Sequence, residues 1–178
     1  MANRLCKIPY VLQDDNFLTQ KECKQIIKKY KKLCTSESLG TYLNYNHIDI
    51  KLDQHWADKL LKLLNKYAKK YNGINIIEPW AIDNVRFKHF PKKYSFDKWH
   101  CEQTKNYPYR IIGILIYLSD HEEGTEFYHE NKTIKSKAGR AIVFPATWTH
   151  IHRGQKTKKD RYLLSAYAFL RNNNEFQK

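Results

Sequence analysis

The feature that most constrains this fold is the change of apolar spacing at Gly73. Before it, apolar residues recur every three or four positions, which predicts two amphipathic helices over about residues 20–33 and 53–71. After it, short apolar runs alternate with polar residues and end at glycines, a pattern typical of strands joined by tight turns. Two helices followed by many strands predict an α+β protein with a helix-backed sandwich or jelly-roll core.

The two helices have recognisable starts and apolar faces. Thr19 and Glu22 fit a capping box, in which the threonine hydroxyl caps the first turn and the glutamate reaches back to the cap. The second helix is expected to start near Asp53. Its apolar stripe consists of Trp56, Leu60, Leu64 and Tyr67. Each helix therefore has one face that the strands must cover.

Length and composition bound the class of protein. A chain of 178 residues suits one domain, with helical support over about 1–72 and a strand-rich core over about 74–170. No apolar run reaches the roughly 18 residues of a membrane span, and no secretory signal is visible, so we expect a cytoplasmic protein without a membrane partner. The four cysteines lack Cys-x-x-Cys spacing, which favours reduced thiols over a zinc or redox motif.

The chain is strongly basic, with 32 lysines and arginines against 18 aspartates and glutamates and a formal net charge of +14. A solvated surface is the plain interpretation. The alternative is an anionic partner such as nucleic acid, because binding a polyanion releases its counterions. Under that alternative, Lys92, Lys93 and Lys98 would form a basic rim beside the site.

One histidine among the eight stands apart, because Glu102 follows His100 at a spacing of two. In a strand such a pair shares a face, which supplies two ligands of a metal site. The third ligand would come from a distant strand, either His150 or His152. On one strand those two would lie about 6.8 Å apart, so a single ion is expected to bind only one of them. Two histidines and a carboxylate leave positions open, as in non-haem Fe(II) sites.

An ordered series of motifs runs through the second half of the chain. It consists of Phe90-Pro91, His100-Cys101-Glu102, Arg110 to Tyr117-Leu118-Ser119-Asp120, Thr125-Glu126-Phe127, Gly139-Arg140 to Phe144-Pro145, His152-Arg153-Gly154 and Arg161. In this order, the series resembles the 2-oxoglutarate- and Fe(II)-dependent oxygenases, specifically their prolyl 4-hydroxylase-like branch. The resemblance implies a double-stranded β-helix, which is a jelly-roll core, with N-terminal supporting helices.

The resemblance implies three iron ligands, which would be His100, Glu102 and His152. In the family, a basic residue follows the second histidine by nine positions. That step selects His152 over His150, because it ends at Arg161. His150 would then be a neighbour or wall residue of the site.

The resemblance also implies a cosubstrate site. Arg161 would pair with the distal carboxylate of 2-oxoglutarate, which a planar guanidinium can grip through two hydrogen bonds. Tyr117 would help to hold that carboxylate, and Thr125 would line the cosubstrate pocket. Arg110 would lie on the substrate side and act there in catalysis.

The implied activity is hydroxylation of a peptidyl residue, prolyl included, or of a small amino-acid-like substrate, with release of succinate and CO₂. The cofactors would be Fe(II) and 2-oxoglutarate, with ascorbate as a reductant. Two alternatives stay open: a nucleic-acid oxidative demethylase on the same core, and a non-catalytic binding protein that retains the barrel. Neither the substrate nor the oligomeric state follows from the sequence.

The chain departs from the family pattern at several positions. Glu102 stands where aspartate is commoner, and it keeps the charge on a longer arm. Phe90 and Leu163 stand where a tyrosine and a serine often assist, so the cosubstrate pocket is expected to be less polar than usual. Loops that select the substrate are expected in about residues 36–52, which include the Tyr42–Tyr45 segment, and 92–109.

Overall fold

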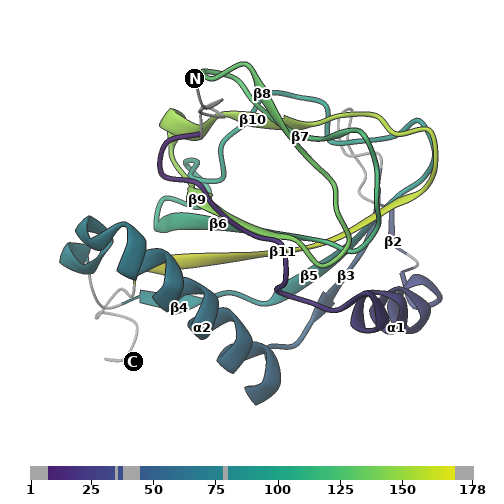
Figure 1. Ribbon diagram of the computed structural model, residues 1–178, viewed down its shortest axis with the longest axis horizontal. Coiled ribbons are helices and arrows are strands. Elements are labelled where there is room, and N and C mark those ends of the chain that lie inside the picture. The colour runs from purple at the N-terminus through teal and green to yellow at the C-terminus, as the bar shows by residue number, and fades with distance from the viewer. Residues whose placement is uncertain (1–7, 35, 38–44, 78–79, 171–178) are drawn as a thin grey trace, which may run out of the picture.

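The structure, a computed structural model, describes residues 8–34, 36–37, 45–77 and 80–170. Two β-sheets face each other and enclose a barrel, and two helices cover the outside of the larger sheet (Figure 1). The larger sheet contains β1 (Leu12–Asp14), β2 (Ser36–Glu37), β3 (Asn46–Ile50), β4 (Trp80–Ile82), β5 (Val85–Phe90), β6 (Arg110–Tyr117), β9 (Ala141–Pro145) and β11 (Arg161–Leu170). The smaller sheet contains β7 (Gly124–Phe127), β8 (Lys132–Lys135) and β10 (His152–Gly154).

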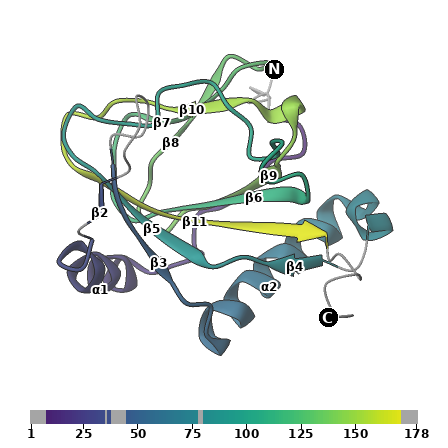
Figure 2. The ribbon, with the colours of Figure 1, turned by 180° about the vertical axis from the view of Figure 1, so that it is seen from behind.

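Antiparallel pairing builds both sheets. The strand order of the larger sheet is β1-β9-β6-β11-β5-β3-β2, with β4 paired to β11, and that of the smaller sheet is β10-β7-β8. Neighbouring strands are thus often far apart in sequence, as a jelly roll requires. The predicted α+β class with a jelly-roll core and N-terminal helices is confirmed, and Figure 2 shows the two sheets from behind.

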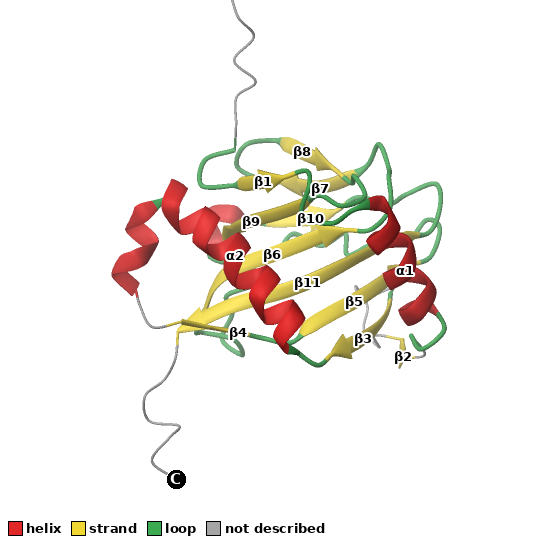
Figure 3. Ribbon diagram, turned by 60° about the horizontal axis from the view of Figure 1, so that its bottom comes forward, coloured by secondary structure: helices red, strands yellow, loops and turns green. Residues whose placement is uncertain are grey.

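The helices form where the sequence predicts them. Helix α1 (Gln20–Lys31) begins with the predicted capping box, in which Thr19 Oγ1 accepts from the Glu22 backbone N–H and the Glu22 carboxylate accepts from the Thr19 N–H. Helix α2 (Gln54–Lys70) buries the predicted stripe, and the short 3₁₀ segment η1 (Asn72–Ile77) follows it. Figure 3 shows both helices lying across the outer face of the larger sheet.

Two apolar cores result from the alternation of side chains along the strands. On β6, Ile114 and Ile116 join the core under the helices, whereas Leu115 and Tyr117 point into the barrel. A strand covered on both faces must be apolar throughout, which explains why β6 shows no polar alternation. The barrel interior between the two sheets is the face left for a binding site.

Two local predictions are wrong. The segment with His100 and Glu102 is not a strand, because His100 makes only an isolated bridge to His152 before the chain turns away. The expected strand over 149–153 is divided into a 3₁₀ turn, η2 (Trp148–His150), and β10. The His150 N–H donates to the Thr147 carbonyl within that turn, so the ladder starts only at His152.

Within the described ranges, no helix has both the length and the apolar character needed to cross a bilayer.

Candidate metal centre and its cavity

Three potential metal ligands meet inside the barrel. His100, Glu102 and His152 each offer a ligand atom, and these atoms all lie within 4.8 Å of one another. Nε2 of His100 lies 3.7 Å and Nε2 of His152 lies 3.5 Å from Oε1 of Glu102. The exposed fraction of the side chain is 24% for His100 against 3% for His152, so the cluster opens toward solvent on the His100 side.

Backbone hydrogen bonds hold the three residues in register. The His100 N–H donates to the His152 carbonyl at 3.0 Å, and the His152 N–H donates back to the His100 carbonyl at 2.8 Å. The Glu102 N–H donates to the carbonyl of Ala146, the residue that follows β9, at 3.0 Å. These hydrogen bonds therefore hold His100 and Glu102 beside His152, about 50 positions away in the chain, although His100 and Glu102 do not lie on a continuous strand.

The hydrogen bonds of the two rings determine which nitrogen faces the centre. Nδ1 of His100 lies 2.9 Å from the Lys98 carbonyl, and Nδ1 of His152 lies 3.0 Å from the His150 carbonyl. A carbonyl oxygen only accepts, so each Nδ1 carries the hydrogen and each neutral ring presents a lone pair at Nε2. Carbonyl partners of this kind also orient metal-binding histidines in general.

The charge of Glu102 favours a cation between the three potential ligands. Burial would raise the pKa of Glu102, but the neighbouring His100 and His152 outweigh burial and hold that pKa well below its ordinary value. Burial lowers the pKa of His152 despite the carboxylate beside it. When both rings are neutral, the charged carboxylate and two ring lone pairs converge, a donor set in which a divalent metal takes the place of the ring protons.

The hydrogen bonds of the His150 ring hold it away from the three potential metal ligands. Its Nε2 lies 2.8 Å from the Pro9 carbonyl, and its Nδ1 lies 3.0 Å from the Thr149 hydroxyl. The expectation that His150 and His152 share one strand face is therefore wrong, because η2 turns the first ring away. His150 still contributes through its backbone carbonyl, which holds the His152 ring.

A cavity of about 250 Å³ adjoins the three ligands and reaches Arg161. The Arg161 side chain is buried, and its Nη1 donates to the Gly124 carbonyl at 3.1 Å. Its Nε has no hydrogen-bond partner among the described residues. A buried guanidinium with an unsatisfied donor is costly unless a ligand supplies an acceptor, so this end of the cavity fits a carboxylate.

Thr125 lines the same cavity, whereas Tyr117 is not among the described lining residues and contacts Thr125 instead. The Tyr117 hydroxyl donates to Thr125 Oγ1 at 2.7 Å. Burial raises the pKa of Tyr117 to about 12, so the phenol stays protonated. Phe90 and Leu163 also line the cavity, as the expectation of a less polar pocket requires, and the Phe90 ring centroid lies 4.9 Å from the Arg161 guanidinium carbon.

Arg110 lies at the other end of the cavity. Its guanidinium carbon lies 3.8 Å from the ring centroids of both Tyr107 and Tyr167. Its Nη1 lies 4.0 Å from Glu102 Oε2, and its Nη2 lies 3.4 Å from Asp83 Oδ2. Arg110 pairs with Phe169 of β11, eight residues along that strand from Arg161, so the two arginines approach the cavity from opposite ends.

Sequence reasoning missed part of the cavity wall. Tyr45, Phe96 and Tyr107 belong to the loops expected over about 36–52 and 92–109, whereas the lining residues that were not singled out are Arg86, Lys88, Leu115 and Tyr167. The signal was present for two of them, because Arg86 and Lys88 alternate with the core residues Val85 and Phe87 and so must face the barrel interior. The predicted rim lysines Lys92, Lys93 and Lys98 are not among the residues that line the cavity, and Tyr42–Asn44 lie outside the described residues.

Comparison with known proteins gives a family for the strand-rich part. Residues 86–169 match the model of the 2OG-Fe(II) oxygenase superfamily, which confirms the family predicted from the ordered motifs. A search of curated protein sequences gives no significant match.

Solved structures share the fold at low identity. The viral collagen prolyl hydroxylase of Paramecium Bursaria Chlorella virus-1, in complex with 2OG, is 18% identical with a TM-score of 0.70, over 94% of this chain and 99% of that one. A Pseudomonas putida prolyl-4-hydroxylase is 15% identical with a TM-score of 0.71, over 91% and 93%. A Trichoplax adhaerens prolyl hydroxylase, in complex with a hypoxia inducible factor peptide fragment, is 16% identical with a TM-score of 0.71, over 90% and 83%.

Proposed function

Residues 86–169 form the core of a 2OG-Fe(II) oxygenase, and on this premise we propose that the whole chain is one domain that hydroxylates a peptidyl residue. The protein is a dioxygenase whose cofactors are Fe(II) and 2-oxoglutarate. One observation carries the proposal: a charged carboxylate and two ring lone pairs converge at one end of a cavity whose other end is a buried arginine with an unsatisfied donor.

His100, Glu102 and His152 would hold the iron. The carbonyls of Lys98 and His150 keep both rings in the tautomer that presents Nε2. Bound iron, with 2-oxoglutarate and O₂, would supply oxidative decarboxylation to succinate and CO₂, with one oxygen atom of O₂ going to succinate and the other inserted into a C–H bond of the substrate. The chain's own part is to hold these groups and to exclude water from them.

Arg161 would pair with the distal carboxylate of 2-oxoglutarate. Its free Nε supplies one charge-assisted hydrogen bond, because no described residue competes for that donor. The Thr125 hydroxyl supplies a second one: since Tyr117 donates to Thr125 Oγ1, the hydrogen of Thr125 itself is free to point into the cavity. Tyr117 thus acts through Thr125 rather than by direct contact.

Arg110 would act on the substrate side, since it lies next to Glu102 and far from Arg161 in the cavity. A peptidyl substrate is supported by the fold shared with prolyl hydroxylases, one of which is described in complex with a peptide fragment. Ascorbate as the reductant rests on the family resemblance. A small amino-acid-like substrate is the second candidate, because the cavity of about 250 Å³ is near the lower end of ligand pockets.

The proposal is tested by succinate release from 2-oxoglutarate with Fe(II), in the presence of pooled peptides, free amino acids or methylated oligonucleotides. We expect turnover with peptides or amino acids and its loss in Glu102→Ala. Glu122→Ala is the matched control, because the Glu122 side chain is 86% exposed and its ion pair within the described part of the chain is with Lys135 at the surface. Turnover that survives Glu102→Ala, or that is confined to oligonucleotides, would refute the proposal.

A further inference from the structure

The cavity wall carries more positive charge than iron and cosubstrate need. The two charges of Fe(II) and the one of Arg161 balance the carboxylate of Glu102 and the two carboxylates of 2-oxoglutarate. Three more basic side chains line the same cavity: Arg86, Lys88 and Arg110. The partners of these three decide how much charge is left for a substrate.

Arg86 is neutralised within the protein. Its Nε lies 2.6 Å from Asp49 Oδ1, and its Nη2 lies 2.9 Å from Asp49 Oδ2, a bidentate pair between β5 and β3. Such a pair satisfies both the charge and the geometry of the guanidinium. Arg86 therefore belongs to the wall and offers little to a ligand.

Lys88 has no such partner. It is half-buried on β5, opposite His47 of β3 and Leu163 of β11. Its contact among the described side chains is aromatic, since Nζ lies 5.4 Å from the ring centroid of Tyr45, and none of the described carboxylates forms an ion pair with it. A half-buried ammonium with no described carboxylate in contact can take an anion brought into the cavity as its partner.

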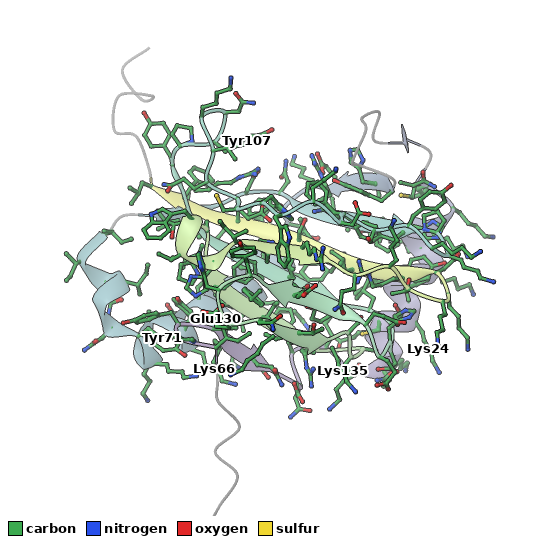
Figure 4. All side chains as sticks on the ribbon, turned by 90° about the horizontal axis from the view of Figure 1, so that it is seen from above. Lys24, Lys66, Tyr71, Tyr107, Glu130 and Lys135 are labelled. Carbon is green, nitrogen blue, oxygen red and sulfur yellow. The ribbon has the colours of Figure 1, made fainter. Side chains whose placement is uncertain are left out.

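Arg110 is held in place but only loosely neutralised. The rings of Tyr107 and Tyr167 lie on it at 3.8 Å each and fix the plane of the guanidinium. Figure 4 shows Tyr107 on a loop that projects from the body of the molecule. Its acidic partners are Asp83, at 3.4 Å and 43% exposed, and Glu102, at 4.0 Å, whose charge a bound metal ion would balance. A contact of that length to a largely exposed carboxylate contributes little, so most of the charge of Arg110 is left for a ligand in the cavity.

We propose, on the basis of the proposed function, that Lys88 and Arg110 form a subsite for a carboxylate of the substrate, so that the hydroxylated residue carries or adjoins an acidic group. The carboxylate has two sources: an aspartyl or glutamyl side chain of a peptide, or the α-carboxylate of a free amino acid. The distal carboxylate of the cosubstrate is assigned to Arg161 instead. Arg161 pairs with Phe90, two residues or about 7 Å along the strands from the pair of Lys88 and Leu163.

The experiment measures binding of paired probes to protein loaded with Mn(II) and 2-oxoglutarate. One pair is acetyl-Gly-Pro-Glu-Gly-amide against the same peptide with glutamine, and the other is L-proline against L-prolinamide. We expect the acidic member of one pair to bind at least about 10-fold more tightly, which corresponds to about 1.4 kcal/mol. The pair that shows the preference identifies the source of the carboxylate.

Variants assign the preference to the subsite. Lys88→Met should abolish the preference for the acidic probe, and Lys88→Arg should retain that preference. Lys24 is an exposed lysine of α1 at the edge of Figure 4, and Lys24→Met should leave the preference unchanged. The dissociation constant of 2-oxoglutarate and the thermal midpoint, measured on the same samples, should stay close to those of the wild-type protein.

Three outcomes overturn the subsite while the proposed function stands: equal binding within both pairs, a preference that survives Lys88→Met, or a weakening of 2-oxoglutarate itself in Lys88→Met. Failure of the wild-type protein to bind Mn(II) and 2-oxoglutarate would remove the proposed function and the subsite together.

Discussion

Gly154→Ala tests whether the Arg161 guanidinium holds 2-oxoglutarate. A Cβ atom at Gly154 would lie 2.8 Å from Arg161 Nη2, about 0.6 Å closer than the 3.4 Å at which ordinary contacts begin. The backbone of Gly154 cannot yield easily, because its N–H donates to the Phe96 carbonyl at 2.7 Å and the residue pairs with Thr125 of β7. The guanidinium must move instead.

The size of the effect follows from that displacement. Arg161 Nη1 reaches the Gly124 carbonyl at 3.1 Å, so a shift of about 0.6 Å away from residue 154 breaks this hydrogen bond and misplaces the free Nε. A hydrogen bond to a charged group contributes roughly 1.5–3 kcal/mol, which corresponds to a roughly 10- to 100-fold loss of affinity for 2-oxoglutarate. The metal ligands stay in place, so metal affinity should change by less than about threefold.

The assay is calorimetric titration of 2-oxoglutarate into Mn(II)-loaded protein, with Mn(II) affinity measured separately. Gly73→Ala is the matched control, because a Cβ at that position would meet nothing within 4 Å. Wild-type affinity for 2-oxoglutarate in Gly154→Ala would refute the assignment of Arg161. Equal losses of metal and 2-oxoglutarate affinity would instead point to general distortion.

Three further predictions concern the same site. Tyr117→Phe removes the donor to buried Thr125 and should lower the free energy of unfolding by about 1–2 kcal/mol, read from denaturant titrations; an unchanged midpoint would contradict this. His150→Ala should lower stability by about 2–4 kcal/mol yet leave Mn(II) affinity within about threefold, because the backbone carbonyl that holds His152 is retained, and a tenfold loss of metal affinity would count against it. The pKa of His152 is lowered in the folded state by burial, so the metal-free protein should lose stability as pH falls below the ordinary histidine value of 6.5, where only the unfolded chain gains a proton. Thermal midpoints measured against pH should show a flatter profile for His152→Ala than for the wild-type protein.

Local patterns predicted the elements well where one physical signal was sufficient. The capping box at Thr19 and the stripe through Leu60 and Leu64 fixed both helices, since capping and amphipathicity are properties of a short segment. The arrangement of strands could be predicted only from the family resemblance that the ordered motifs carry. Periodicity does not say which strand pairs with which, and β11 pairs with β4, β5 and β6 at once.

At the site, contacts between residues distant in sequence determine the geometry, and a local sequence pattern does not show them. His100 and Glu102 were expected to share a face because they would lie on a strand, yet they come together through a loop held by the backbone of His152 and Ala146. The separation of His150 from His152 depends on a 3₁₀ turn and on the Pro9 carbonyl, a contact across 141 positions. The alternation along β5 places Lys88 on the face opposite Val85 and Phe87, but it does not show that this face encloses a cavity.

The most direct test of the iron assignment is a crystal structure of the protein grown without oxygen in the presence of Mn(II) and 2-oxoglutarate. We predict one ion, identified by anomalous scattering, at roughly 2.0–2.2 Å from Nε2 of His100, a carboxylate oxygen of Glu102 and Nε2 of His152, with the distal carboxylate of 2-oxoglutarate on Arg161. An ion bound elsewhere, or these three side chains in contact with no ion, would contradict the account.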